Sequence, residues 1–127
     1  MSRAIADMSV FIARESGRPL GDLPDEIAVS VVTAAELELG VLRANHAAIR
    51  AIRLATLASV RTEYPLLAID DQTASCFARI ADAELPGGLK LRRHDTWIAA
   101  TALRHGVPVV TRDPDFTAFA TVEVIHV

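Results

Sequence analysis

Cysteine is nearly absent from this sequence of 127 residues, which contains Cys76 and no other cysteine. A single cysteine cannot form an intrachain disulfide, and it cannot build a thiolate cluster for zinc. Cys76 lies in the segment TASCFARIA, whose apolar spacing is typical of an amphipathic helix. We therefore interpret it as a buried, unreactive thiol rather than a nucleophile.

Long apolar runs are absent as well, and none reaches the roughly 18 residues that a membrane-spanning helix needs. The first residues carry Asp7 within their apolar stretch and do not have the layout of a secretory signal. We therefore expect a cytoplasmic protein. Because 51% of the residues are hydrophobic and the chain is short, we expect one globular domain covering residues 1–127.

Lysine is represented by Lys90 alone among 13 basic residues, and the formal net charge is −3. The lack of a basic excess argues mildly against a nucleic-acid-binding domain, which usually shows a basic footprint. It does not exclude one, because arginine is the better bidentate partner for phosphates. A cluster of acids would also lower the net charge without removing arginines elsewhere.

Short apolar runs alternate with helical patterns along the chain. We expect strands at residues 3–6, 27–32, 66–69, 107–110 and 122–125. We expect helices starting near residue 10 and spanning about 33–45, 47–61, 71–84 and 95–105, the last ended by Gly106. This alternation predicts a parallel sheet with helices on both faces, in which ligands bind beyond the carboxyl ends of the strands.

The acids that follow the first two strands have ordinary structural interpretations. Asp7 comes directly after the first expected strand and is a suitable N-cap for the next helix. Thr33 and Glu36 have the spacing of a capping box, with Thr33 as the N-cap.

Three later acids lie in HDTWIAATALRHGVPVVTRDPDF (94–116). Asp95 precedes a helical pattern, where its charge suits a helix N-terminus. Asp113 precedes Pro114, a pair typical of the start of a short helix, and this would place Asp115 in the first turn.

Taken together, these acids share one position in the expected fold. Asp7, Glu36 and Asp113 flank the carboxyl ends of the first, second and fourth strands, and Asp95 opens the helix before the fourth. If those strands are neighbours, the carboxylates lie close together and repel one another unless a cation neutralises them. Oxygen ligands of this kind suit Mg²⁺ or Mn²⁺. The four acids together therefore predict a metal site, although none of them would do so alone.

The same residues give the chain a resemblance to the PIN-domain ribonucleases, and most closely to the VapC toxins of bacterial toxin–antitoxin pairs. The matching stretches are residues 5–13, 29–41, 94–116 and 122–127. The resemblance implies an α/β/α sandwich with a five-stranded parallel sheet. It also implies a Mg²⁺- or Mn²⁺-dependent endoribonuclease that cleaves tRNA, rRNA or mRNA, forms a homodimer and is inhibited by a cognate VapB antitoxin.

The resemblance also assigns site residues. The acids that it implies as catalytic residues and metal ligands are Asp7, Glu36, Asp95, Asp113 and Asp115. Ser9 is expected to hydrogen-bond the first of these acids. Either Glu36 or Asp115 would take the proton of the attacking water.

Nearby basic residues keep two interpretations each. Arg112 would either hold a substrate phosphate or pair with Asp113. Arg92 and Arg93 could guide RNA electrostatically, although we favour a solvated loop. For His94 we favour a solvent-facing residue before a helix over a general base.

One position departs from the family pattern, because Met8 stands where the family usually has threonine. This departure motivates an alternative function, a catalytically weak module that still binds antitoxin or RNA. A second alternative is a receiver-like signalling domain, suggested by Asp70 and Asp71 after the third strand. That alternative needs a late lysine after a strand, which the position of Lys90 does not provide.

Residues 37–62 carry more apolar side chains than one small sheet needs. The simplest interpretation is core packing. The functional interpretation is a groove for an amphipathic segment of the antitoxin.

Overall fold

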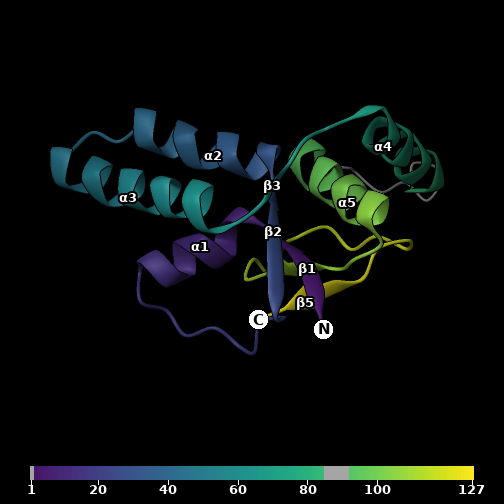
Figure 1. Cartoon of the computed structure of the whole chain (residues 1–127), viewed down its shortest axis with the longest axis horizontal. Helices are drawn as coiled ribbons and strands as arrows, with labels where there is room; N and C mark the ends of the chain where they lie inside the picture. Colours follow the sequence, from purple (N-terminus) through teal and green to yellow (C-terminus); the bar gives the residue numbers. More distant parts are fainter. Residues whose placement is uncertain (1, 85–91) are drawn as a thin grey trace.

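The computed structural model describes residues 2–84 and 92–127 (Figure 1). Five strands and five helices are assigned in these ranges. In chain order they are β1 (Arg3–Ala6), α1 (Met8–Glu15), β2 (Glu26–Ser30), α2 (Val31–Leu42), α3 (Ala47–Glu63), β3 (Leu66–Leu67), α4 (Asp71–Glu84), α5 (Arg93–His105), β4 (Val109–Thr111) and β5 (Val124–His126). None of the helices is long and apolar enough to cross a membrane.

The five strands form a single parallel sheet in the order β3-β2-β1-β4-β5. The expected five-stranded parallel sheet is therefore confirmed, and β1 lies between β2 and β4. Since parallel strands end at the same edge, residues that follow β1, β2 and β4 come together there.

Alternating side chains of the sheet pack into two cores, one on each face. Ile5 and Val109 face a cluster formed with α4 and α5, where Ile98 and Cys76 are buried. Ala6 and Val110 face the opposite way, toward α1, α2 and α3. This period of two gives the three-layer α/β/α arrangement.

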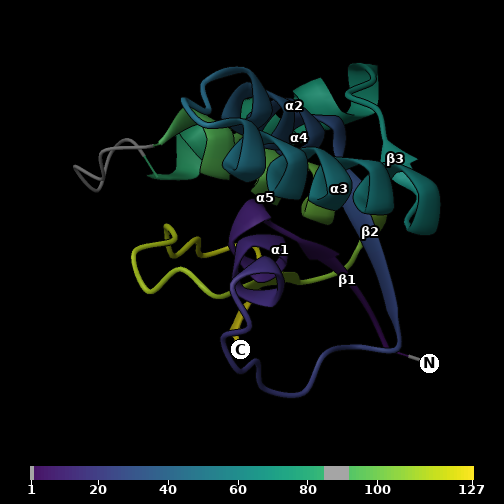
Figure 2. The same ribbon diagram turned by 90° about the vertical axis from the view of Figure 1, so that its left-hand side faces the viewer.

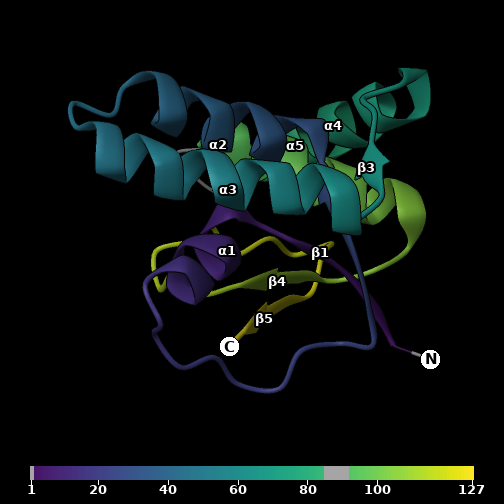
Figure 3. The same cartoon turned by 60° about the vertical axis from the view of Figure 1, so that its left-hand side comes forward.

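Helices α2 and α3 lie side by side as a long hairpin, with α1 next to them (Figures 2 and 3). The far end of this hairpin extends beyond the sheet (Figure 1). Its inner side chains Leu37, Val41 and Leu57 are buried. Five large apolar residues between positions 37 and 62 stay exposed, so core packing explains only part of the apolar surplus in this segment. They are Leu39, Leu42, Ile49, Ile52 and Leu54.

The predicted capping box at Thr33 and Glu36 is wrong. Helix α2 starts two residues earlier, and Ser30 is its N-cap, with its hydroxyl accepting the N–H of Val32 at 3.1 Å. Thr33 is buried, and its hydroxyl has no hydrogen-bond partner among the described residues. The last residue of β2 has the extended backbone that an N-cap needs, so strand and helix join without a loop.

Two further helix starts differ from the predictions. Helix α5 begins at Arg93 with Arg92 as its N-cap, so Asp95 lies in the first turn rather than at the cap. Within residues 92–127, no helix follows Asp113. The Asp113 carboxylate instead accepts the N–H of Asp115 at 2.8 Å and closes a local turn.

The predicted bounds of α4 and the predicted end of α5 agree with the structure, whereas four of the five strands differ from their expected bounds by one or two residues. Helix α4 spans residues 71–84 as expected, and Gly106 ends α5 with φ +67°, a conformation that favours glycine. Pro86, Gly87, Gly88 and Lys90 lie outside the described residues.

Candidate active site

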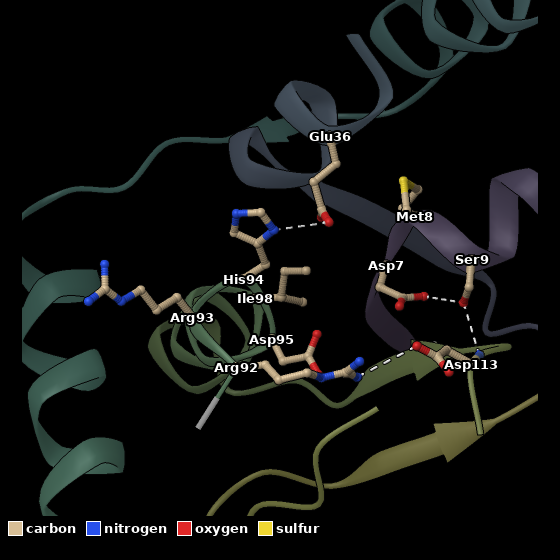
Figure 4. Close-up of a pocket in the computed structure, with 10 residues that line it drawn as sticks. All are labelled: Asp7, Met8, Ser9, Glu36, Arg92, Arg93, His94, Asp95, Ile98 and Asp113. Atoms are coloured by element: carbon tan, nitrogen blue, oxygen red, sulfur yellow. Dashed lines mark hydrogen bonds and ion pairs between the residues drawn. The ribbon is translucent and has the colours of Figure 1, made fainter. Parts of the chain in front are cut away.

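A pocket of about 350 Å³ lies at the edge where β1 and β4 end, beside the second turn of α2 and the first turn of α5 (Figure 4). Ten residues line it: Asp7, Met8, Ser9, Glu36, Arg92, Arg93, His94, Asp95, Ile98 and Asp113. Four of the five acids predicted as site residues are therefore brought together. Asp115, the fifth, is exposed in the neighbouring turn and does not line the pocket.

Asp7 forms the inner wall of the pocket. It follows β1 and precedes α1, and only 7% of its surface is exposed. It occupies the N-cap position as expected, but its side chain makes no capping bond. Burial raises the pKa of this carboxyl, the hydroxyls of Ser9 and Thr111 oppose the rise, and the charges of Asp95 and Asp113 add to it.

Ser9 connects the two strands that carry the pocket. Its hydroxyl donates to the Asp7 carboxylate at 2.6 Å. The same oxygen accepts the backbone N–H groups of Arg112 at 2.7 Å and Asp113 at 3.1 Å, and it lies 3.1 Å from the hydroxyl of Thr111. The expected bond from Ser9 to Asp7 is present, and Ser9 also fixes the backbone of the turn after β4.

Glu36 enters the pocket from the second turn of α2. Its carboxylate lies 3.3 Å from Nδ1 of His94, a residue that keeps 64% of its side chain exposed. Burial raises the pKa of Glu36, His94 opposes the rise, and Asp7 and Asp95 add to it. His94 is thus solvent-facing as expected, and it also contacts an acid of the pocket.

Arg92 reaches back from the start of α5 to the acids on the outer side of the pocket. Its guanidinium contacts Oδ2 of Asp95 through Nε at 2.8 Å and Nη2 at 2.5 Å. Nη2 also lies 3.6 Å from Oδ2 of Asp113 and donates to the carbonyl of Asp115 at 2.6 Å. The preferred prediction of a solvated loop residue is therefore wrong for Arg92.

Asp95 has a second set of donors behind it. The backbone N–H and the hydroxyl of Thr117 each lie 3.1 Å from Oδ2 of Asp95. Its other carboxylate oxygen points into the pocket (Figure 4). The side chain is only 13% exposed, so its orientation is fixed by these contacts.

Arg112 does not form the predicted pair with Asp113. Its guanidinium donates to the carbonyl of Pro19, in the loop between α1 and β2. Among the described residues it forms no ion pair with Asp113, and it does not line the pocket.

Four carboxylates around one small cavity provide the oxygen donors that Mg²⁺ or Mn²⁺ prefers. Asp7 has no cationic partner among the ion pairs of the described residues, so part of the negative charge is unbalanced. In residues 2–84 and 92–127, no three carboxylate or imidazole groups are already arranged around one coordination point. The donor chemistry fits a divalent ion, and coordination requires side-chain rotation.

Two residues that support the pocket acids were missed from the sequence. The hydroxyl of Thr111 accepts the N–H of Asp113, and the hydroxyl of Thr117 contacts Asp95. Arg92 was named from the sequence, but not as the one side-chain cation in contact with two pocket acids among the described residues. The spacing of Arg92 and Asp95, three residues apart at a helix start, was the one available signal.

Asp70, the acid behind the receiver-like alternative, has a different role. Its Oδ1 accepts the N–H and the hydroxyl of Thr73, each at 2.8 Å, so it caps α4. These hydrogen bonds lower the pKa of Asp70. It follows the edge strand β3 and does not line the pocket, so the structure gives that alternative no support.

The family model described as "PIN domain" matches residues 5–122. "Ribonuclease VapC5" from Mycobacterium tuberculosis is 47% identical, over 97% of this chain and 94% of the relative. "Ribonuclease VapC4" from the same organism is 40% identical, over 98% and 97% of the two chains.

Solved structures agree with these relatives. A crystal structure of VapBC-5 from Mycobacterium tuberculosis, described as a member of the VapBC family of toxin-antitoxin systems, matches with a TM-score of 0.85 and 42% identity over 100% of both chains. FitAcB from Neisseria gonorrhoeae matches with a TM-score of 0.78 and 27% identity over 96% of each chain.

Proposed function

Because the chain belongs to the PIN-domain family, we propose that it is a divalent-metal-dependent endoribonuclease toxin of the VapC type, inhibited by a cognate VapB-type antitoxin. The observation that carries the proposal is the convergence of Asp7, Glu36, Asp95 and Asp113 on one pocket at the carboxyl edge of the sheet. Cellular RNA is the proposed substrate, in the form of tRNA, rRNA or mRNA.

The four acids would hold one or two Mg²⁺ or Mn²⁺ ions. When bound, such an ion lowers the pKa of water and neutralises charge on the phosphate oxygens. Glu36 is the better placed of the two proposed bases, because it lines the pocket whereas Asp115 does not.

Glu36 also has a suitable environment for moving a proton. Its raised pKa brings it closer to neutral pH, which favours general-base catalysis. Nδ1 of His94 contacts the Glu36 carboxylate at the exposed side of the pocket, so the imidazole could receive the proton that Glu36 accepts. Asp115 would contribute through its backbone, which holds the Asp113 carboxylate and contacts Arg92.

Cleavage of total bacterial RNA tests the activity, with 5′ ends mapped in Mg²⁺, Mn²⁺ or EDTA. An Asp95→Asn protein purified in the same way controls for contaminating nuclease, because the amide keeps an oxygen for Thr117. We expect discrete cuts that require metal and disappear in the variant. Equal cleavage by both proteins would contradict the proposal.

The α2–α3 hairpin supports the proposed antitoxin partner. A groove of about 590 Å³ runs along α1 and α2, lined by apolar residues such as Ile12 and Leu39. It shares Met8, Glu36 and His94 with the acidic pocket, so a bound segment would lie directly beside the acids. An amphipathic helix is the segment that fits such a groove.

Co-expression tests this partner. We expect the cognate antitoxin to copurify with the chain and to suppress RNA cleavage, and Leu39→Asp to weaken both effects because it places a charge in the groove. Loss of copurification without any change in inhibition would contradict the assignment of the groove.

Three remaining expectations belong to the same proposal. They are a single domain over residues 1–127, a homodimer, and a cytoplasmic location. Light scattering of the purified chain at several concentrations measures the oligomeric state, and we expect twice the mass of 13.7 kDa.

A further inference from the structure

Arg92 lies where an acidic pocket would otherwise leave its outer carboxylates unbalanced. Its guanidinium contacts Asp95 at 2.5 and 2.8 Å and lies 3.6 Å from Asp113 (Figure 4). These acids come from α5 and from the turn after β4, so one side chain joins two elements of the site. Arg92 therefore balances charge at the place where a metal ion would do so.

We propose that Arg92 is a tethered counter-cation, which a divalent ion must displace from Asp95 and Asp113 before the site is loaded. This inference rests on the proposed metal-dependent function and adds a step that precedes catalysis. Arg92 is a positioning residue in this scheme. Its guanidinium occupies the carboxylates of Asp95 and Asp113 and keeps them from coordinating the metal until the ion displaces it.

The oxygen atoms that Arg92 uses are the reason for competition. Oδ2 of Asp95 already has contacts to Nε and Nη2 of Arg92 and to two groups of Thr117, more than its lone pairs can serve well. On Asp113, Oδ1 accepts the N–H of Asp115 and Oδ2 faces Arg92. A metal ion can coordinate these oxygen atoms of both acids only if the guanidinium of Arg92 moves away.

Arg92 can move its side chain without disturbing the helix. Its carbonyl accepts the N–H of Thr96 at 2.9 Å and the Thr96 hydroxyl at 2.8 Å, so its backbone is anchored to the first turn of α5. The Arg92 side chain is 47% exposed. Rotation into solvent therefore breaks polar contacts at the pocket and removes little buried surface.

Isothermal titration of the metal-free protein with Mn²⁺, without RNA, tests the displacement. We expect Arg92→Gln to bind Mn²⁺ about tenfold more tightly than the unchanged protein, because the charge-assisted contacts of the guanidinium with Asp95 no longer compete. Arg93→Gln is the matched control, since it removes the same charge from the next residue. Arg93 lines the pocket but forms no ion pair among the described residues, so we expect less than about a threefold gain from lost repulsion alone.

Thermal unfolding in EDTA supplies a second readout. Without metal, Arg92→Gln should lower the melting temperature more than Arg93→Gln does, because Asp95 and Asp113 lose their counter-cation. With saturating Mn²⁺ the order should reverse. Arg92→Lys keeps the charge but not the planar guanidinium. Its affinity for Mn²⁺ should lie between the affinities of Arg92→Gln and Arg93→Gln.

The outcomes separate this inference from the proposed function. If the unchanged protein binds Mn²⁺ and Arg92→Gln binds it no more tightly, or no more tightly than Arg93→Gln, the displacement is wrong and the metal site stands. If only Arg92→Gln binds Mn²⁺, the displacement is supported in its strongest form. If no variant binds Mn²⁺, the metal site fails and the inference fails with it.

Discussion

The inner and outer sides of the acidic pocket balance their negative charge in different ways. On the inner side, Asp7 is buried and hydroxyl groups support it, and among the described residues no cationic side chain pairs with it. On the outer side, Asp95 and Asp113 share the guanidinium of Arg92. The inner acid therefore has a raised pKa and the outer acids have a partner that can leave. In the absence of a metal ion, a carboxylate can therefore be accommodated either by a raised pKa or by pairing with an arginine that a cation can displace.

Asp7→Asn should break the inner side and have the largest effect. We expect cleavage to fall by about a thousandfold or more, because the central oxygen ligand loses its charge. The metal-free protein should gain about 1 kcal/mol of unfolding free energy, since the substitution removes a buried, unpaired charge at a functional site. RNA cleavage and urea denaturation in EDTA measure the two effects. A large loss of stability would contradict the description of Asp7 as a buried acid with no cationic partner among the described residues.

Ser9→Ala should loosen the inner side without removing its charge. The hydroxyl fixes Asp7 and the backbone N–H groups of Arg112 and Asp113, so its loss should lower Mn²⁺ affinity or cleavage by about 10- to 100-fold. Unfolding free energy should fall by about 1–2 kcal/mol, because buried donors lose their acceptor. Ser9→Thr is the matched control, since it keeps the hydroxyl. Equal losses in both variants would indicate a packing effect instead.

The pH dependence should distinguish the inner side from the rest of the protein. The pKa of Asp7 is raised above 3.8, so folding favours its neutral form. Its contribution to stability is therefore present below about pH 4 and is lost as pH rises through the raised pKa. The stability gained by Asp7→Asn in EDTA should grow from about pH 4 to pH 7. A constant gain across this range would show that the charge of Asp7 is not the cause.

Metal binding should follow the opposite trend with pH. Asp7 and Glu36 both have raised pKa values, and both must be ionised to bind a cation. Mn²⁺ affinity of the unchanged protein should therefore increase with pH across the same range, which titrations at several pH values would measure.

Met8→Thr should have the smallest effect. The hydroxyl that the family usually carries at this position is absent, yet Ser9 already donates to Asp7 at 2.6 Å. We expect cleavage to change by less than about threefold, because the orienting hydrogen bond is already made. A gain of 100-fold would instead support the alternative function, a catalytically weak binding module.

The acids could be placed from the sequence because parallel strands end at one edge. Asp7 and Asp113 follow apolar runs that could only be strands, so their meeting required only that β1 and β4 be neighbours. Helix starts were harder to place. Ser30 ends a strand and caps a helix at once, and the Asp113–Pro114 pair suits a turn as well as a helix start.

The contacts of Arg92 could not be predicted in the same way. A long side chain at a helix start can face solvent or fold back, and the sequence does not determine which neighbours it finds. Asp113 and Asp115 come within reach only through β4, and Thr117 only through the turn that follows. These partners depend on the tertiary fold.

The hydrogen bond from the N–H of Asp113 to the hydroxyl of Ser9 joins residues 104 positions apart. Asp7, Glu36 and Asp95 precede β4 in the chain, and Asp113 follows it. A chain that ends before β4 therefore lacks one of the four pocket acids, and on the proposed mechanism it should not cleave RNA.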